Sequence, residues 1–81
     1  MIFTAEVKVM PLKELLDPQG KAVSDGLKNL GLQNVNDVRI GKHINLQIEA
    51  TSKEEANTIA EDAAKRLLAN PVMEEFSIQI I

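Results

Sequence analysis

Few side chains in this sequence have the types and spacing that catalysis requires. The paired carboxylates Glu54-Glu55 and Glu74-Glu75 are candidates for general acid–base work. Adjacent residues on a strand point to opposite faces, and neighbours on a helix lie about 100° apart, so neither pair converges on a substrate. His43 is the single histidine and cysteine is absent, which excludes thiol chemistry and Cys- or His-rich metal sites. No catalytic, cofactor-binding or metal-binding residue is predicted, and these side chains are interpreted as exposed surface.

The start of a helix is the first feature that could hold a ligand. The run Asp17-Pro18-Gln19-Gly20-Lys21 places an N-cap acceptor before a proline at the first helical position. The free N–H groups there, with the Lys21 ammonium, would attract an anion. A simple helix cap explains the same residues, and both interpretations stay open.

A strand that ends in a tight turn is the second feature. Residues 35–40 alternate in polarity, and Gly41-Lys42 then offers a two-residue reversal with glycine first. This pattern predicts a type II′ hairpin, in which Gly41 takes a positive φ. Arg39 would then lie on the open face of a sheet and Lys42 at the hairpin tip, where both could contact a partner.

The periodicity of the remaining sequence predicts the elements that position these residues. Alternation over residues 3–10, 43–49 and 75–80 predicts strands, and helical spacing after Asp17 and Ser52 predicts helices that end near Gly31 and Asn70. The order βαββαβ predicts an α+β, ferredoxin-like fold: an antiparallel sheet with two helices on one face and its first and third strands in the centre.

Length and charge limit the function classes. The chain has 81 residues and a net charge of −3 with scattered Lys and Arg, which predicts one domain over residues 1–81 and argues against nucleic acid. No apolar run reaches the roughly 20 residues that span a bilayer, so no membrane partner is expected and the location is predicted to be cytoplasmic. A domain this small buries a limited core, so self-association, as a dimer or tetramer, is expected.

Three separated stretches resemble the signature sequences of the PurS family, the small subunit of phosphoribosylformylglycinamidine (FGAM) synthase. They are Leu16-Asp17-Pro18-Gln19-Gly20-Lys21-Ala22-Val23, Asp37-Val38-Arg39-Ile40-Gly41-Lys42 and Leu67-Leu68-Ala69-Asn70-Pro71-Val72-Met73-Glu74. The stretches agree with the family in order and spacing, and the resemblance covers essentially the whole chain.

The resemblance implies an accessory role in purine biosynthesis. A PurS protein dimerises and bridges a glutaminase subunit, which releases ammonia from glutamine, to a large synthetase subunit, which uses ATP and Mg²⁺ to make the amidine. No cofactor is then bound by this chain. By motif position the family signature falls on Asp17, Pro18, Gln19, Gly20, Lys21, Arg39, Gly41, Lys42, Asn70 and Pro71. Capping and turn geometry are sufficient to explain Asp17, Gly20, Gly41 and Pro71. They do not explain Gln19, Arg39 and Lys42, which are therefore predicted to contact partners.

Two other function classes stay open. Ferredoxin-like domains often dimerise and bind ligands between protomers, so a free-standing ligand-sensing module is the main alternative. A small enzyme with its site at a dimer interface is the other, and the shortage of His, Cys and Tyr argues against it.

Overall fold

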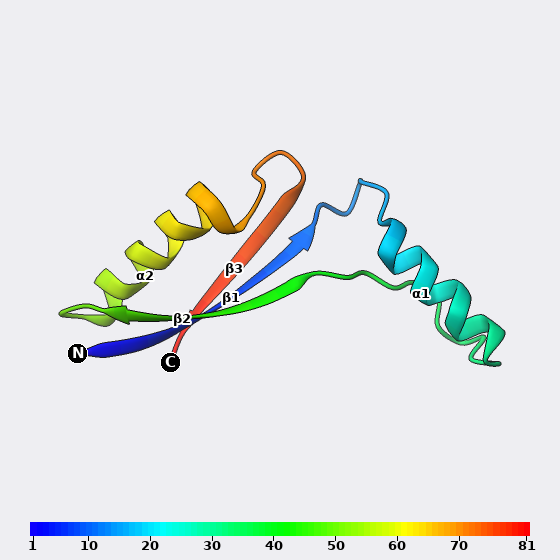
Figure 1. Cartoon of the computed structure of the whole chain (residues 1–81), viewed down its shortest axis with the longest axis horizontal. Helices are drawn as coiled ribbons and strands as arrows, with labels where there is room; N and C mark the ends of the chain where they lie inside the picture. Colours follow the sequence, from blue (N-terminus) through cyan, green and yellow to red (C-terminus); the bar gives the residue numbers. More distant parts are fainter.

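The computed structural model describes residues 1–81. The chain forms β1 (Ile2–Pro11), α1 (Pro18–Asn29), β2 (Lys42–Glu49), α2 (Lys53–Ala63), a short π-helical continuation of α2 (Ala64–Leu68) and β3 (Glu74–Ile80). Figure 1 shows the sheet and α2 at one end of the molecule and α1 at the other. The predicted α+β class and antiparallel sheet are confirmed. The elements follow the ferredoxin-like order, except that the strand predicted for residues 35–40 does not form.

The sheet has three antiparallel strands in the order β2-β1-β3. Val7 of β1 lies opposite Ile44 on one side and Ile78 on the other, so the apolar positions of all three strands share one face. The prediction that β1 is central is confirmed. The third predicted strand, residues 43–49, corresponds to β2 and was also expected to be central. That prediction is wrong, because no strand of the chain pairs with the outer edge of β2.

Helix α2 packs on this apolar face through small side chains. Ser52 caps the helix by accepting a hydrogen bond from the Glu55 N–H at 3.1 Å. Ala56, Ala60 and Ala64 are fully buried against the sheet, where Val7 and Val9 are the largest side chains that are completely enclosed. Alanine at each contact lets the helix axis approach the strands closely, and the core is correspondingly thin.

The predicted hairpin at Gly41-Lys42 does not form. Residues 35–40 belong to no helix or sheet, and Lys42 is already the first residue of β2, opposite Val9. Gly31 is the one residue with positive φ, at 87°, so Gly41 does not adopt the turn conformation that the sequence predicted. The chain instead continues into β2 without reversing, as the green segment of Figure 1 shows.

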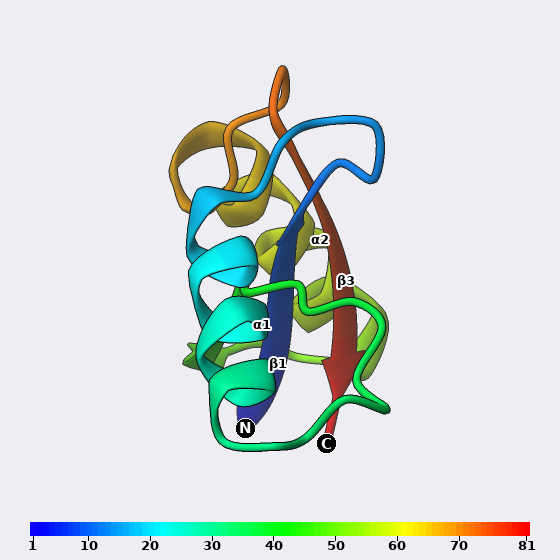
Figure 2. The same cartoon turned by 90° about the vertical axis from the view of Figure 1, so that its right-hand side faces the viewer.

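The prediction that both helices cover one face of the sheet is also wrong within this chain. Helix α1 contributes no residue to either buried cluster, and its one buried residue is Gly20 at its start. In Figure 2, viewed from the α1 end, α1 is nearest the viewer and α2 lies beyond it. The molecule is therefore elongated, 51 × 24 × 14 Å, and we refer to residues 18–29 as the arm.

Candidate functional site

Asp17 joins the arm to the strand segment that precedes β2. One carboxylate oxygen accepts the Gly20 N–H at 2.9 Å, as an N-cap does, and the other accepts the Ile40 N–H, also at 2.9 Å. These two backbone hydrogen bonds, helped by the nearby Arg39 guanidinium, hold the pKa of Asp17 below its usual value of 3.8. The predicted cap is confirmed, and the same carboxylate also fixes a segment 23 residues away.

Arg39 does not lie on the open face of the sheet, where the hairpin prediction placed it. Its Nη2 donates a hydrogen bond to the carbonyl oxygen of Pro11, the last residue of β1. Its Nε is buried and has no protein partner. The guanidinium therefore links the end of β1 to the segment before β2.

Two glycines allow these segments to approach each other. A Cβ on Gly20 would lie 2.1 Å from the carbonyl oxygen of Val38, and one on Gly41 would lie 2.2 Å from that of Val9. Real Cβ atoms do not come within 3.0 Å of such atoms. Glycine is needed at both positions for close backbone approach. We call the junction formed by Pro11, residues 17–20 and residues 38–41 the elbow.

The third signature stretch forms the turn before β3 and reaches the same region. The Asn70 side chain accepts the Val72 N–H at 3.0 Å, and the Asn70 N–H donates to the Glu74 carboxylate at 2.7 Å. The Leu12 N–H donates to the Met73 carbonyl oxygen at 2.9 Å, which ties the turn to the end of β1. The three stretches are therefore brought together in space.

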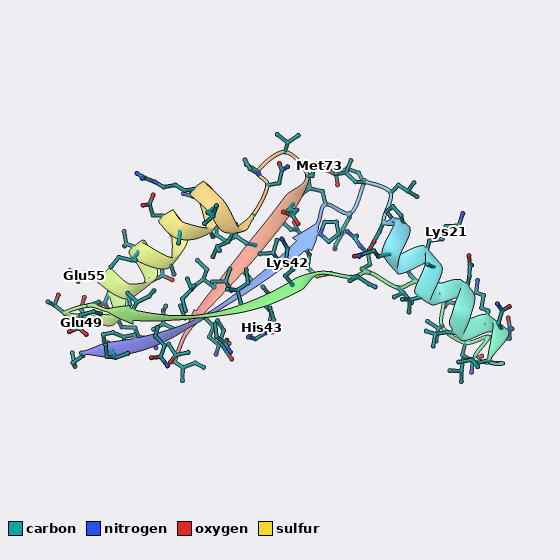
Figure 3. All side chains as sticks on the ribbon, viewed as in Figure 1. Lys21, Lys42, His43, Glu49, Glu55 and Met73 are labelled. Carbon is teal, nitrogen blue, oxygen red and sulfur yellow. The ribbon has the colours of Figure 1, made fainter.

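An open groove of about 620 Å³ lies where they meet. We call it the junction groove. Its lining residues come from all three stretches and from the ends of β1 and β3: Pro11, Leu15, Leu16, Asp17, Pro18, Gln19, Ile40, Gly41, Lys42, Asn70, Met73 and Glu74. Figure 3 labels Lys42 and Met73 at this junction and Lys21 on the arm.

The predicted site residues lie around two depressions, and Asp17 lines both of them. Gln19 and Lys42 line the junction groove together with Asp17, Pro18, Gly41 and Asn70. Arg39, Gly20 and Lys21 line a second depression of about 360 Å³. Pro71 borders neither.

Sequence reasoning missed the apolar part of the junction groove. Leu16 is 80% exposed and Met73 is 54% exposed, although both are large apolar side chains. Their signal in the sequence is the position of apolar residues directly before a helix cap and inside a turn, where no core contact is expected. Large exposed apolar side chains, methionine among them, are typical of a surface that binds another protein.

His43 and Glu55, two of the side chains considered for catalysis, make contacts within the chain. His43 pairs with the Asn45 amide oxygen at 2.9 Å and lies 3.7 Å from the Glu6 carboxylate. Glu55 accepts hydrogen bonds from the Thr51 backbone and hydroxyl. No group of three or more His, Cys, Asp or Glu side chains is placed to hold a metal ion. None of the helices has the length and apolar character to cross a membrane.

Comparison with known proteins agrees with this arrangement. The family model PurS, described as phosphoribosylformylglycinamidine (FGAM) synthase, matches residues 4–81. The PurS subunit of FGAM synthase from Mycobacterium leprae is 44% identical over 75 residues, which are 91% of this chain and 90% of that protein. The crystal structure of the PurS subunit from Thermotoga maritima matches with a TM-score of 0.92 at 32% identity, covering 100% of this chain and 93% of that one. A chain of the PurLQS structure from the same organism matches with the same score and identity, covering 100% and 99%. This chain therefore belongs to the PurS family of FGAM synthase subunits.

Proposed function

We propose that this chain is the non-catalytic bridge of its FGAM synthase, and that the junction groove is the surface through which it holds a partner subunit. The observation that carries the proposal is the convergence of three distant signature stretches on one groove with exposed apolar side chains. A groove lined by Leu16 and Met73, with Lys42 at its edge, suits an apolar anchor residue next to an acidic one on the partner.

The chemistry of the complex would be divided between the other subunits. A glutaminase subunit releases ammonia from glutamine, and a synthetase subunit uses ATP with Mg²⁺ to replace the amide oxygen of formylglycinamide ribonucleotide by that nitrogen. The present chain would hold the active sites of the two other subunits in a fixed relative position, so that ammonia passes between them. Under this proposal the protein is cytoplasmic.

Gln19 and Lys42 are the proposed contact residues, because both line the junction groove and the side chain of neither makes a hydrogen bond or ion pair within the chain. Arg39 is still predicted to contact a partner, but its hydrogen bond to Pro11 also stabilises the elbow. A residue that only contacts a partner and a residue that stabilises the elbow differ in their effect on the melting temperature of the isolated protein. Lys42→Ala should leave the melting temperature unchanged, whereas Arg39→Ala should lower it.

Reconstitution with the two larger subunits tests the proposal. Glutamine-dependent amidine formation and complex mass, from size-exclusion chromatography with light scattering, would be measured with and without this chain. Lys42→Ala should weaken assembly about tenfold, which corresponds to a lost contact of about 1.4 kcal/mol. Lys53→Ala, which removes an exposed lysine at the start of α2, is the matched control and should assemble normally.

Activity with ammonium chloride in place of glutamine separates bridging from chemistry. A bridge is needed for the glutamine-dependent rate and is dispensable when ammonia is supplied directly. If the larger subunits reach full glutamine-dependent activity without this chain and form no complex with it, the proposed function is wrong.

The volume of the junction groove supports a second candidate. At about 620 Å³ it falls within the range of small-molecule sites, roughly 300–1,000 Å³, so a ligand-sensing role is the alternative. A thermal-shift screen of nucleotides and amino acids on the isolated protein tests it. A ligand that raises the melting temperature of the wild type but not of Leu16→Ser would favour sensing, and no shift would reject it.

A further inference from the structure

The outer edge of β3 is unpaired, because the sheet order β2-β1-β3 leaves β1 as its single neighbour. Two hydrogen bonds at the ends of the β1–β3 pairing fix the alternation of that pairing. The Ile81 N–H donates to the Thr4 carbonyl oxygen at 2.9 Å. At the other end the Leu12 N–H donates to the Met73 carbonyl oxygen, also at 2.9 Å. Hydrogen-bonded and non-bonded pairs alternate along an antiparallel ladder, so every second residue of β3 directs its N–H and C=O away from β1.

Phe76, Ile78 and Ile80 are the residues whose backbone groups point outward. Natural proteins usually protect such an edge with lysine, proline or a bulge. The sequence of β3 contains neither lysine nor proline, and its register with β1 runs without a bulge from Glu74 to Ile80. Its only charges are the two glutamates at its start. The rest of the edge is therefore open to a further strand.

Two depressions lie along this edge, between β3 and the neighbouring α2 (Figure 1). One, of about 590 Å³, lies beside Ile78 and Ile80 and is bordered by Asn57 of α2. The other, of about 470 Å³, lies beside Phe76 and is bordered by Lys65 in the π-helical continuation of α2. Consecutive residues of β3, whose side chains point to opposite faces, line each depression, so both lie at the strand edge rather than over one face of the sheet. We call the two depressions and the β3 edge between them the edge groove.

The end of the edge groove at the start of β3 is acidic. Glu74 and Glu75 line the depression there, with Lys65 as the one cation. None of these three side chains forms an ion pair within the chain. At the other end of the groove Lys53 offsets Glu54. A basic side chain of a bound molecule is therefore attracted to the end near Glu75, and this charge complementarity sets the direction in which an occupant lies.

An extended polypeptide is the occupant that matches these features. Its backbone presents N–H and C=O groups toward a neighbouring strand at every second residue, about 6.6 Å apart, which is the repeat of the free groups on Phe76, Ile78 and Ile80. A helix satisfies its own backbone groups and offers none to a strand edge. Addition of a strand to a free edge, with alternate side chains entering pockets, is a recurring mode of peptide recognition.

We propose that the edge groove binds an extended segment of another protein, which adds to β3 as a fourth, antiparallel strand. The segment has apolar side chains at alternate positions, which enter the groove beside α2. It carries a basic residue at its C-terminal end, which lies near Glu75 because the start of β3 faces the end of an antiparallel partner. The proposal does not depend on the bridging role, because the edge groove and the junction groove share only Glu74 among their lining residues.

The first test asks whether the β3 edge is free in solution. Amide hydrogen exchange of the whole chain would be followed by NMR. The N–H groups of Glu75, Ser77 and Gln79 face β1 and should be protected from exchange. Those of Phe76 and Ile78 point outward and should exchange rapidly. Protection of Phe76 and Ile78 in the free protein would show that a second copy already covers this edge, and the proposal would be wrong.

The second test uses a fluorescein-labelled peptide of alternating valine and threonine that ends in two lysines. Fluorescence anisotropy measures its affinity for the whole chain, and ¹⁵N chemical shifts locate it. Valines opposite Phe76, Ile78 and Ile80 share their face of the sheet, so the valine N–H groups bond to β3 and the threonine N–H groups point to water. N-methylation of the valines should weaken binding about tenfold or more, whereas N-methylation of the threonines should not. No binding at about 1 mM peptide, equal effects of the two methylations, or shifts on another surface would overturn the proposal.

A variant of the acidic end tests the direction of the segment. Glu75→Gln should weaken binding of the lysine-ended peptide about two- to threefold, as expected for an exposed ion pair. Glu14→Gln, which changes an exposed glutamate in the loop after β1, is the matched control and should bind like the wild type. A peptide that ends in two threonines should bind the wild type and Glu75→Gln equally. Equal affinity of the lysine-ended peptide for the wild type and Glu75→Gln would overturn the assigned direction and charge of the segment.

Discussion

Replacing Gly41 with alanine tests whether the elbow is held by close backbone approach. A Cβ built on Gly41 lies 2.2 Å from the carbonyl oxygen of Val9, about 1.2 Å short of ordinary contact at 3.4 Å. It also lies 2.3 Å from the Met10 sulfur, but that flexible thioether can rotate away and the Val9 carbonyl in central β1 cannot. Overpacking of this kind costs about 1–3 kcal/mol. For a domain of this size the melting temperature should fall by about 4 °C or more.

Gly26→Ala is the matched control, because a Cβ at Gly26 has nothing within 4 Å. Gly26 lies inside exposed α1, where alanine is the better helix former, so this variant should gain about 0.5–1 kcal/mol. Thermal and urea unfolding would be followed by circular dichroism at one protein concentration, since association changes the apparent stability. A Gly41→Ala variant that melts as high as the wild type would refute the packing argument.

Three further predictions concern the elbow and the core. Gly20→Ala should destabilise the protein by about 1–3 kcal/mol despite its helical position, because the new methyl meets the Val38 oxygen at 2.1 Å; a gain in urea midpoint would contradict this. Ala60→Leu should cost a similar amount, because the side chain is fully buried between α2 and the sheet, and a near-wild-type melting curve would show that the core has room. Asp17→Asn keeps the cap but loses the acceptor for Ile40, so it should melt below the wild type at neutral pH. The pKa of Asp17 is lower in the folded protein than its usual value of 3.8. The stabilisation by its carboxylate is therefore complete above pH 3.8 and is lost as the pH falls through the folded pKa. At that low pH the melting temperatures of the wild type and Asp17→Asn should converge.

The local elements could be predicted from the sequence because their signals are local. Alternation identified all three strands that the sheet contains, and Asp17 and Ser52 marked both helix starts. The helix ends near Gly31 as predicted: Gly31 takes a positive φ, and the Leu32 N–H donates to the Leu27 carbonyl oxygen at 3.0 Å, as in a Schellman ending.

The direction of the arm could not be predicted in this way. A glycine before lysine is compatible with a turn and with close approach to another segment, and only the tertiary contact of Gly41 with Val9 distinguishes the two. The hydrogen bond of Asp17 to Ile40 spans 23 residues, and no periodicity encodes it. The candidate site was found in part: Gln19 and Lys42 were predicted as contact residues, whereas Leu16 and Met73 lie inside the signature stretches but were not singled out as site residues.

Because the arm is anchored only at its base, a small rotation at the base produces a large displacement at the tip. Asp17 and Arg39 act at its base, and the 12-residue helix then extends freely to Leu30. A rotation of only about 10° at the base moves the tip of an 18 Å helix by about 3 Å, more than half of a helical turn. Small changes in hydrogen-bond geometry at Asp17 are therefore magnified into larger displacements at Leu30.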